Sequence, residues 1–420
     1  MRLQLALSVP ALLVGIVSAS ILFGLNQLSG LLHDGIWSGL PKLLGVEPSS
    51  GWWIFGVLSL TGLAIGLVVW LMPGHGGRDS ATTELIAEPL RVAALPSLAL
   101  VTMLALAGGV SLGPENPIIA INTGVLVAVI ARLWPKVPTA LVVMTTAAAT
   151  IGALFGTPVA AALVFTGVVG AFKAGGAIWD RLFLPLVAAA AGSITMLMYD
   201  HTAGMALTLP AYTAIAPGDL LSAAVIAAVA ALLGLCAAVA LPRVHSAFRM
   251  LRSPVVYITL GGVILGVLGA IGGPITLFKG LSQMGDLVAH RADYSAGQLA
   301  LIVAVKVVAL VIAAAAGFRG GRIFPAVFIG AAIGVLANAL IPGIPLAVAL
   351  SAGVLGVVLA VARDGWIAIF VATAITGGIV VLPLLCVAVL PVWLLVSRAP
   401  QMIVKPAQTA PTVAASTGSA

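Results

Sequence analysis

The sequence has very little charge. Only 7% of its 420 residues are Asp, Glu, Lys or Arg, whereas 61% are hydrophobic, and the mean hydropathy is +1.23. Soluble domains carry about a quarter charged residues, so this composition excludes a soluble protein and favours one that crosses a membrane many times. The formal net charge is +7. Because the basic residues lie in loops between apolar runs, we interpret them as topology signals and expect no nucleic-acid partner.

Cysteine and histidine are also scarce. Cys236 and Cys386 both lie in apolar runs and indicate no disulfide framework. The five histidines are scattered without metal-ligand spacing, so we expect no metal and no cofactor. The sequence shows no nucleophile–base pair and no phosphate-binding loop, and we therefore do not expect an enzyme.

Apolar runs cover most of the chain and leave no room for a soluble domain. They are 8–26, 53–72, 97–112, 117–131, 138–152, 158–171, 184–199, 220–241, 254–271, 298–316, 324–341, 345–362, 365–378 and 379–396. A straight span needs about 20 apolar residues, and several runs are shorter and begin at Pro or Gly. We predict an all-α polytopic membrane domain over 1–400, with broken and tilted helices, and a disordered cytoplasmic tail over 401–420.

The ends of the runs give an orientation. The first run resembles a signal peptide, but it is long enough to span and further spans follow at once, so we interpret it as the first transmembrane helix. Loop 242–253 carries three arginines and no acid, whereas loop 200–219 carries two aspartates and no Lys or Arg. The positive-inside rule places the first loop in the cytoplasm and the second outside.

One stretch, Gly109 to Pro117, combines two helix-breaking prolines, two glycines and a carboxylate, Glu115, between apolar runs. A charge at membrane depth is costly unless it faces protein, water or an ion. The helix that follows would point its N-terminal N–H groups at the space beside Glu115. These features predict an anion site with an adjacent carboxylate, although an acid in a first helical turn can also be a simple cap.

The second half of the chain repeats this pattern 208 residues later. Gly317 to Pro325 has Gly, Gly and Pro at the same spacing, and Ile118 to Ile121 corresponds to Ala326 to Ile329. Paired interrupted segments in two halves indicate a binding site at the interface of inverted repeats. We therefore predict two inverted halves, roughly 1–215 and 216–400.

These segments resemble motifs of the CLC family of chloride channels and chloride–proton antiporters. Leu112 to Pro117 is similar to that family's Gly-Lys/Arg-Glu-Gly-Pro segment, with Pro114 at the basic position and Asn116 at the glycine. Gly321 to Pro325 is similar to its Gly-x-Phe-x-Pro segment, with Ile323 at the phenylalanine position. The order and spacing fit over nearly the whole chain, and the resemblance is to a bacterial branch of ion-channel proteins.

The resemblance implies the roles of specific residues. It makes Glu115 the gating glutamate and places an anion near Gly113, Asn116, Ile323 and Phe324. The family's Gly-Ser-Gly-Ile-Pro motif has no direct match, and Ser80 is the candidate for its anion-contacting serine. The family's C-terminal tyrosine also has no counterpart.

Five further charged positions each need an interpretation. Arg319 and Arg322 either attract anions at a vestibule or are ordinary interfacial arginines. Lys306, inside an apolar run, either faces a water-filled path or snorkels, and we favour the path. Arg363 and Asp364 are expected to form a structural loop pair.

We therefore expect a homodimeric, multi-pass protein of the bacterial inner membrane that conducts small anions, chloride first among them, through a channel gated by Glu115. The alternative is a proton-coupled chloride antiporter of the same fold. Antiporters of the family often have an inner glutamate on the helix after Pro158, where this chain has Gly167 and Val168. A membrane enzyme or a carrier of cations or organic solutes is a third possibility, but a cation carrier would more often show several buried acids.

Overall fold

The computed structural model describes residues 2–171, 177–201 and 204–405. The predicted all-α architecture is confirmed, because within these ranges the structure is helical apart from loops and one isolated β-bridge. The first-half helices are α1 (Arg2–Asp34), α2 (Leu40–Leu44), α3 (Gly51–Leu71), α4 (Leu95–Ala107), α5 (Glu115–Leu133), α6 (Thr139–Phe155), α7 (Pro158–Ala171) and α8 (Ile178–Tyr199). A π-helical turn, η1 (Gly35–Gly39), joins α1 to α2, and a 3₁₀ turn, η2 (Val92–Ala94), leads into α4.

The second half has a similar order of helices. They are α9 (Pro217–Arg249), α10 (Pro254–Gly272), α11 (Leu281–Ala289), α12 (Ala296–Ala315), α13 (Ile323–Leu340), α14 (Leu346–Ala362), α15 (Gly365–Ala374) and α16 (Leu382–Val396). Short 3₁₀ turns are η3 (Pro274–Thr276), η4 (Arg291–Asp293) and η5 (Ile379–Val381). Helices α5 and α13 begin 208 residues apart, at Glu115 and Ile323, which is the offset found in the sequence.

The helix lengths fit a membrane protein with broken spans. Within the described residues, nine helical segments are long and apolar enough to cross a membrane, and five others are apolar but shorter. Among the short ones are α7 and α15, which begin at Pro158 and Gly365 as the sequence predicted. Many large apolar side chains are exposed, including Trp52, Leu43 and Met250, as expected of a lipid-facing surface.

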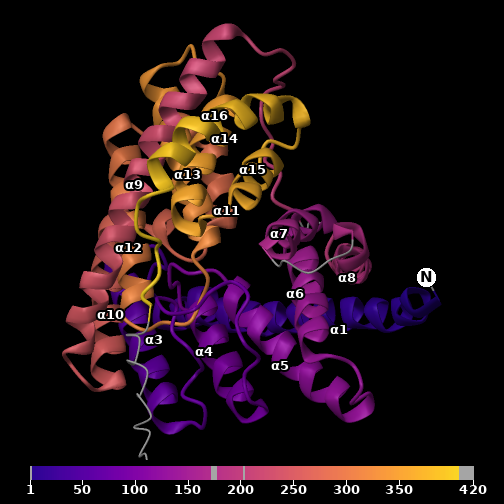
Figure 1. Ribbon diagram of the computed structural model, residues 1–420. Coiled ribbons are helices and arrows are strands. Elements are labelled where there is room, and N and C mark those ends of the chain that lie inside the picture. The colour runs from indigo at the N-terminus through magenta and orange to yellow at the C-terminus, as the bar shows by residue number, and fades with distance from the viewer. Residues whose placement is uncertain (1, 172–176, 202–203, 406–420) are drawn as a thin grey trace, which may run out of the picture.

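The two halves pack against each other through α3 and α10, which lie side by side at the lower left of Figure 1. Their contact is built on small residues. A Cβ atom added to Gly62 would lie 2.9 Å from the Cα of Gly262, and one added to Gly66 would lie 2.9 Å from the Cα of Val255. Small residues at helix contacts allow the backbones to approach closely, which is how membrane helices associate without a hydrophobic driving force.

The helix directions define two faces of the molecule. Helix α9 joins residues 204–216 to residues 250–253, so these two segments lie at its opposite ends. We name the end with residues 250–253 the inner face and the end with residues 204–216 the outer face. Helix α10 returns from the inner face, so the segment 273–295 that follows it lies on the outer face.

The chain stays packed beyond residue 400, where we expected the disordered tail to begin. Residues 401–405, which we placed in a disordered tail, instead pack on the first half: Met402 is buried, the Val404 N–H donates to the Ala81 carbonyl at 2.8 Å, and Arg322 donates to the Met402 carbonyl. The rest of the expected tail, 406–420, lies outside the described residues.

A charged cluster ties the halves together on the inner face. The buried carboxylate of Asp79 accepts hydrogen bonds from Arg249 of α9 and from the N–H and hydroxyl of Thr82, and the His245 Nε2 lies 3.5 Å away. The Arg249 guanidinium also lies over the Tyr257 ring, 4.4 Å from its centroid. Burial raises the pKa of Asp79, but the bonds from His245 and Thr82 and the charge of Arg249 outweigh it and lower the pKa to about 2.

Topology is tested by cysteine accessibility in a variant in which Cys236 and Cys386 are Ala. Thr208 and Ser246 are both exposed and lie at opposite ends of α9. We expect an impermeant thiol reagent added to whole cells to label Thr208→Cys and to label Ser246→Cys only after the membrane is permeabilised. Labelling of both, or of Ser246→Cys alone, would refute the orientation.

The Asp79 cluster predicts a pH-dependent stability. Because the folded pKa lies below the ordinary 3.8, ionised Asp79 contributes about 2 kcal/mol above roughly pH 4, and this is lost as the pH falls towards about 2. Asp79→Asn should therefore lower the melting temperature of detergent-solubilised protein at neutral pH, and the difference from the wild type should shrink on acidification. The exposed Asp286 provides the control, Asp286→Asn, for which we expect no such difference.

Candidate functional site

The centre of the molecule is a bridge between the two repeated segments. The Gly113 N–H donates to the Gly321 carbonyl at 2.8 Å, and the Gly321 N–H donates to the Gly113 carbonyl at 2.7 Å. The bridge is antiparallel and joins equivalent positions of the two halves, 208 residues apart. This reciprocal pairing brings the starts of α5 and α13 together, as inverted repeats require.

Glu115 lies beside this bridge and is 1% exposed. Its Oε1 accepts hydrogen bonds from the backbone N–H of Ile323 at 2.7 Å and of Phe324 at 3.4 Å. The carboxylate of the first residue of α5 therefore caps α13, the equivalent helix of the other half. Its Oε2 has no hydrogen-bond partner among the described residues.

Two glycines make room for the carboxylate. A Cβ atom at Gly321 would lie 1.9 Å from the Glu115 Cδ, and one at Gly113 would lie 2.0 Å from its Oε2. No side chain fits at such distances. The glycines that looked like helix breakers in the sequence are thus also required by the close approach of Glu115 to the backbone.

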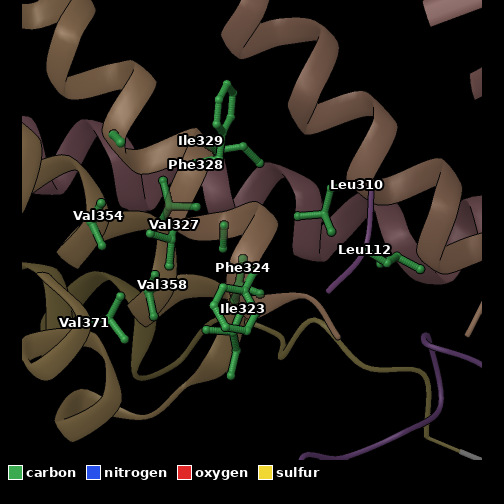
Figure 2. Close-up of a cluster of buried hydrophobic side chains, with 14 of the residues drawn as sticks. Leu112, Leu310, Ile323, Phe324, Val327, Phe328, Ile329, Val354, Val358 and Val371 are labelled. Carbon is green, nitrogen blue, oxygen red and sulfur yellow. The ribbon is translucent and has the colours of Figure 1, made fainter. Parts of the chain in front are cut away.

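The walls around the capped helix end are apolar. Figure 2 shows Ile323 and Phe324 in a buried cluster that also contains Leu112, Leu310 and Val358. The Phe324 ring stacks on Phe155 of α6, with centroids 5.7 Å apart. Amide donors set in apolar walls suit a weakly hydrated anion, because there is little water to compete with them.

A cavity of about 800 Å³ opens beside the site. It is lined by Asn116 and Ile323, the residues next to the Glu115 carboxylate, and by Arg322, Arg363, Asp364 and Glu84. Residues 401–403 also line it, which places its mouth on the inner face. Asn116 closes one side through a 3.4 Å hydrogen bond from its Nδ2 to the Thr83 carbonyl.

Ser80 lies in a separate hollow of about 30 Å³ that also touches Asn116 and Arg319. Its N–H donates to the Phe318 carbonyl at 3.0 Å, while its buried Oγ has no partner among the described residues. The structure therefore brings Ser80 close to one predicted site residue, Asn116, but not into contact with Glu115.

The two predicted pore arginines differ. Arg319 is buried and donates to the carbonyls of His75, Gly76 and Gly77, at 2.7 to 3.2 Å, so it holds the 75–77 turn in place. Arg322 donates to the carbonyls of Met402 and Thr83 and lines the large cavity. Its charge also interacts with that of Glu115. Of the two, only Arg322 both lines the large cavity and interacts with the charge of Glu115.

Lys306 does not face a water-filled path, contrary to our expectation. It is fully buried, and its Nζ donates to three consecutive carbonyls, those of Thr276, Leu277 and Phe278, at 2.7 to 3.0 Å. Lys279, which follows Phe278 in the sequence, interacts electrostatically with Glu115. Sequence reasoning missed Lys279, because a basic residue between two apolar runs looks like any other topology signal.

The remaining predicted positions lie further from the carboxylate. Asp364 caps α15, accepting from the N–H groups of Trp366 at 2.9 Å and Ile367 at 3.0 Å, rather than serving chiefly as a partner for Arg363. Gly167 lies on α7, and the side chain of Val168 is outside the described part of the structure. Helix α7 carries no acidic residue, but two acids from other segments, Glu84 and Asp364, line the cavity.

Comparison with known proteins identifies the chain's relatives. A family model described as "Voltage gated chloride channel" matches residues 60–395. The chain is 45% identical over 411 residues to the "Putative ion-transport protein YfeO" of Escherichia coli strain 55989, and equally to that of Shigella boydii serotype 4. In both pairs the match covers 98% of each chain.

Solved structures share the fold. A slow cyanobacterial Cl−/H+ antiporter superposes with a TM-score of 0.77 at 20% identity, covering 93% of this chain and 95% of the other. A CLC-type fluoride/proton antiporter superposes with a TM-score of 0.73 at 18% identity, covering 94% and 96%. Together with the family model, which spans most of the sequence, these likenesses confirm the predicted resemblance: the chain belongs to the voltage-gated chloride channel (CLC) family.

Proposed function

We propose that the protein moves small anions, chloride first among them, across the bacterial inner membrane, and that Glu115 gates their path. The proposal rests on one observation: the Glu115 Oε1 accepts hydrogen bonds from the backbone N–H groups of Ile323 and Phe324. Two N–H groups at a helix N-terminus form an anion site, and here a carboxylate of the same chain occupies it.

The gating step follows from competition for these amides. Two negative charges at close range in a low-dielectric site repel strongly, so the carboxylate and an anion cannot share the site. When Glu115 is protonated, it loses the charge that holds it to the Ile323 and Phe324 N–H groups and can leave them to the anion. The cavity on the inner face, lined by Arg322, supplies the approach from that side.

Other parts of the proposal rest on the family and on composition. The family resemblance implies a homodimer with one path in each subunit, and the charges of segments 200–219 and 242–253 support the orientation. Gly113 and Asn116 border the proposed anion position, while Ser80 would act in the adjoining hollow.

Proton-coupled antiport is the second candidate. The observation that favours it is the pair of carboxylates, Glu84 and Asp364, in the cavity that reaches Asn116 and Ile323. They could exchange protons with the inner solution, although no titratable residue occupies the equivalent position on α7 at Gly167. A water chain between the cavity and Glu115 would be needed to complete the relay.

The anion-path proposal is tested with purified protein in liposomes. Wild-type protein should carry chloride with a reversal potential that follows the chloride gradient and ignores the potassium gradient. Glu115→Gln keeps the shape of the side chain but removes its charge, so flux should rise and lose most of its pH dependence.

The exposed Glu47 provides the control, since Glu47→Gln removes a carboxylate far from the site. It should behave as the wild type. A potassium-following reversal potential would refute anion selectivity. Unchanged flux and pH dependence in Glu115→Gln would leave Glu115 as a helix cap only.

Coupling is tested separately. Because α7 lacks an inner acid at Gly167, we expect chloride to run down its gradient with little obligatory proton counter-flux. The measurement is proton uptake into liposomes driven by a chloride gradient, with the voltage clamped away from the proton equilibrium. Robust uphill proton movement at a fixed ratio would favour the antiporter, and Glu84→Gln and Asp364→Asn would then show which acid serves it.

A further inference from the structure

An unusual loop, residues 273–280, follows the outer end of α10 and carries Lys279, whose charge interacts with that of Glu115. Phe278 has φ +58°, a conformation that residues with a Cβ atom rarely adopt, and Gly273 and Gly280 also have positive φ. The Phe278 N–H donates to the Gly109 carbonyl at 3.0 Å, which attaches the loop to the segment that carries Glu115. A strained loop of this kind persists only where its surroundings fix it.

Lys306 fixes this loop from within the bundle. Its ammonium is wholly buried, donates to the carbonyls of residues 276, 277 and 278, and lies 5.1 Å from the centroid of the Phe328 ring. A lysine has three N–H donors, so these three bonds use all of them. These bonds hold the carbonyls of residues 276, 277 and 278 on one side of the loop. The side chain of the next residue, Lys279, extends towards Phe324 instead.

Lys279 points to the helix end that binds Glu115. Its Nζ lies 5.9 Å from the centroid of the Phe324 ring, and the N–H of Phe324 is one of the two amides on the Glu115 carboxylate. Lys279 and Glu115 interact through their charges, yet no hydrogen bond between them is described. The Glu115 Oε2 is buried without a partner. The ammonium therefore acts on the site as a nearby charge and not as a cap on the carboxylate.

The two cations that interact with Glu115 come from different segments of the molecule. Arg322 lines the inner cavity, whereas Lys279 belongs to the loop on the outer face. On the outer side, the segment before Glu115 supplies no charge of its own, because the residue there is Pro114.

We propose that Lys279 is the outer anion-recruiting residue of the path: held by the Lys306-locked loop, its ammonium attracts a small anion to the outer side of the Ile323 and Phe324 amides. This inference rests on the proposed function. A fixed cation with low-dielectric protein around it raises the local concentration of anions, an effect that salt screens.

The first test measures chloride uptake from the outer side by oriented proteoliposomes. Lys279→Met should raise the external chloride concentration for half-maximal flux several-fold, while Lys279→Arg, which keeps the charge, should not. The difference should be largest in dilute salt, where the Debye length is about 30 Å, and should fade near 1 M, where it is about 3 Å. Lys42→Met, which removes an exposed lysine from the same face, is the matched control.

A charge-restoration test covers the case in which Lys279→Met folds poorly. In protein with Ala at Cys236 and Cys386, Lys279→Cys is modified from outside with a cationic or an anionic methanethiosulfonate. The cationic adduct should restore the low half-saturation concentration and the anionic adduct should raise it further, because only the sign of the charge differs between the two.

The outcomes separate this inference from the function on which it rests. If wild-type protein carries no anion, the proposed function and this inference both fail. If wild-type protein carries chloride and the Lys279 variants or the two adducts match it at low salt, only the role of Lys279 is refuted. A salt-dependent, charge-dependent shift absent from Lys42→Met would support it.

Discussion

The structure depends on how one buried carboxylate is accommodated. Glu115 is almost fully enclosed, and transferring an ionised carboxylate from water into such a site is very costly unless hydrogen bonds and nearby charges compensate. The compensation comes from the other half of the chain, through the amides of Ile323 and Phe324 and the charges of Lys279 and Arg322. The site therefore exists only when both halves are folded and docked.

Direct contacts between backbones fix the position of one half of the chain relative to the other. The Gly113–Gly321 bridge leaves no room for a Cβ atom beside the Glu115 carboxylate, and α3 and α10 approach through Gly62 and Gly262 in the same way. Backbone contacts cannot change rotamer, so they fix the starts of α5 and α13 more tightly than side-chain packing would. A pre-organised pair of amides is what an anion site in an apolar surrounding requires.

Much of this arrangement could be predicted from the sequence, because it depends on features of short stretches of the chain. Helix breakers at a repeated offset of 208 residues mark both segments, and hydropathy marks the spans, so the all-α fold, the halves and the position of Glu115 followed from residue order. What could not be predicted depends on distant contacts. Lys306 looks like a pore residue until its three carbonyl partners are seen, Arg319 proves to hold a turn, and nothing local distinguishes Lys279 from other loop lysines.

The same contacts explain how one site could both hold and release a charge. Only one oxygen of Glu115 is bonded, and its partners are neutral amides rather than a guanidinium or an ammonium. A direct ion pair at low dielectric would hold the carboxylate far more tightly, because breaking a buried pair costs several kcal/mol, roughly 3–5. Amides with cations at a distance favour any small anion at this position without favouring Glu115 specifically. The proposed gate needs this kind of binding, because a gating carboxylate must exchange with a diffusible ion, whereas a structural cap need not.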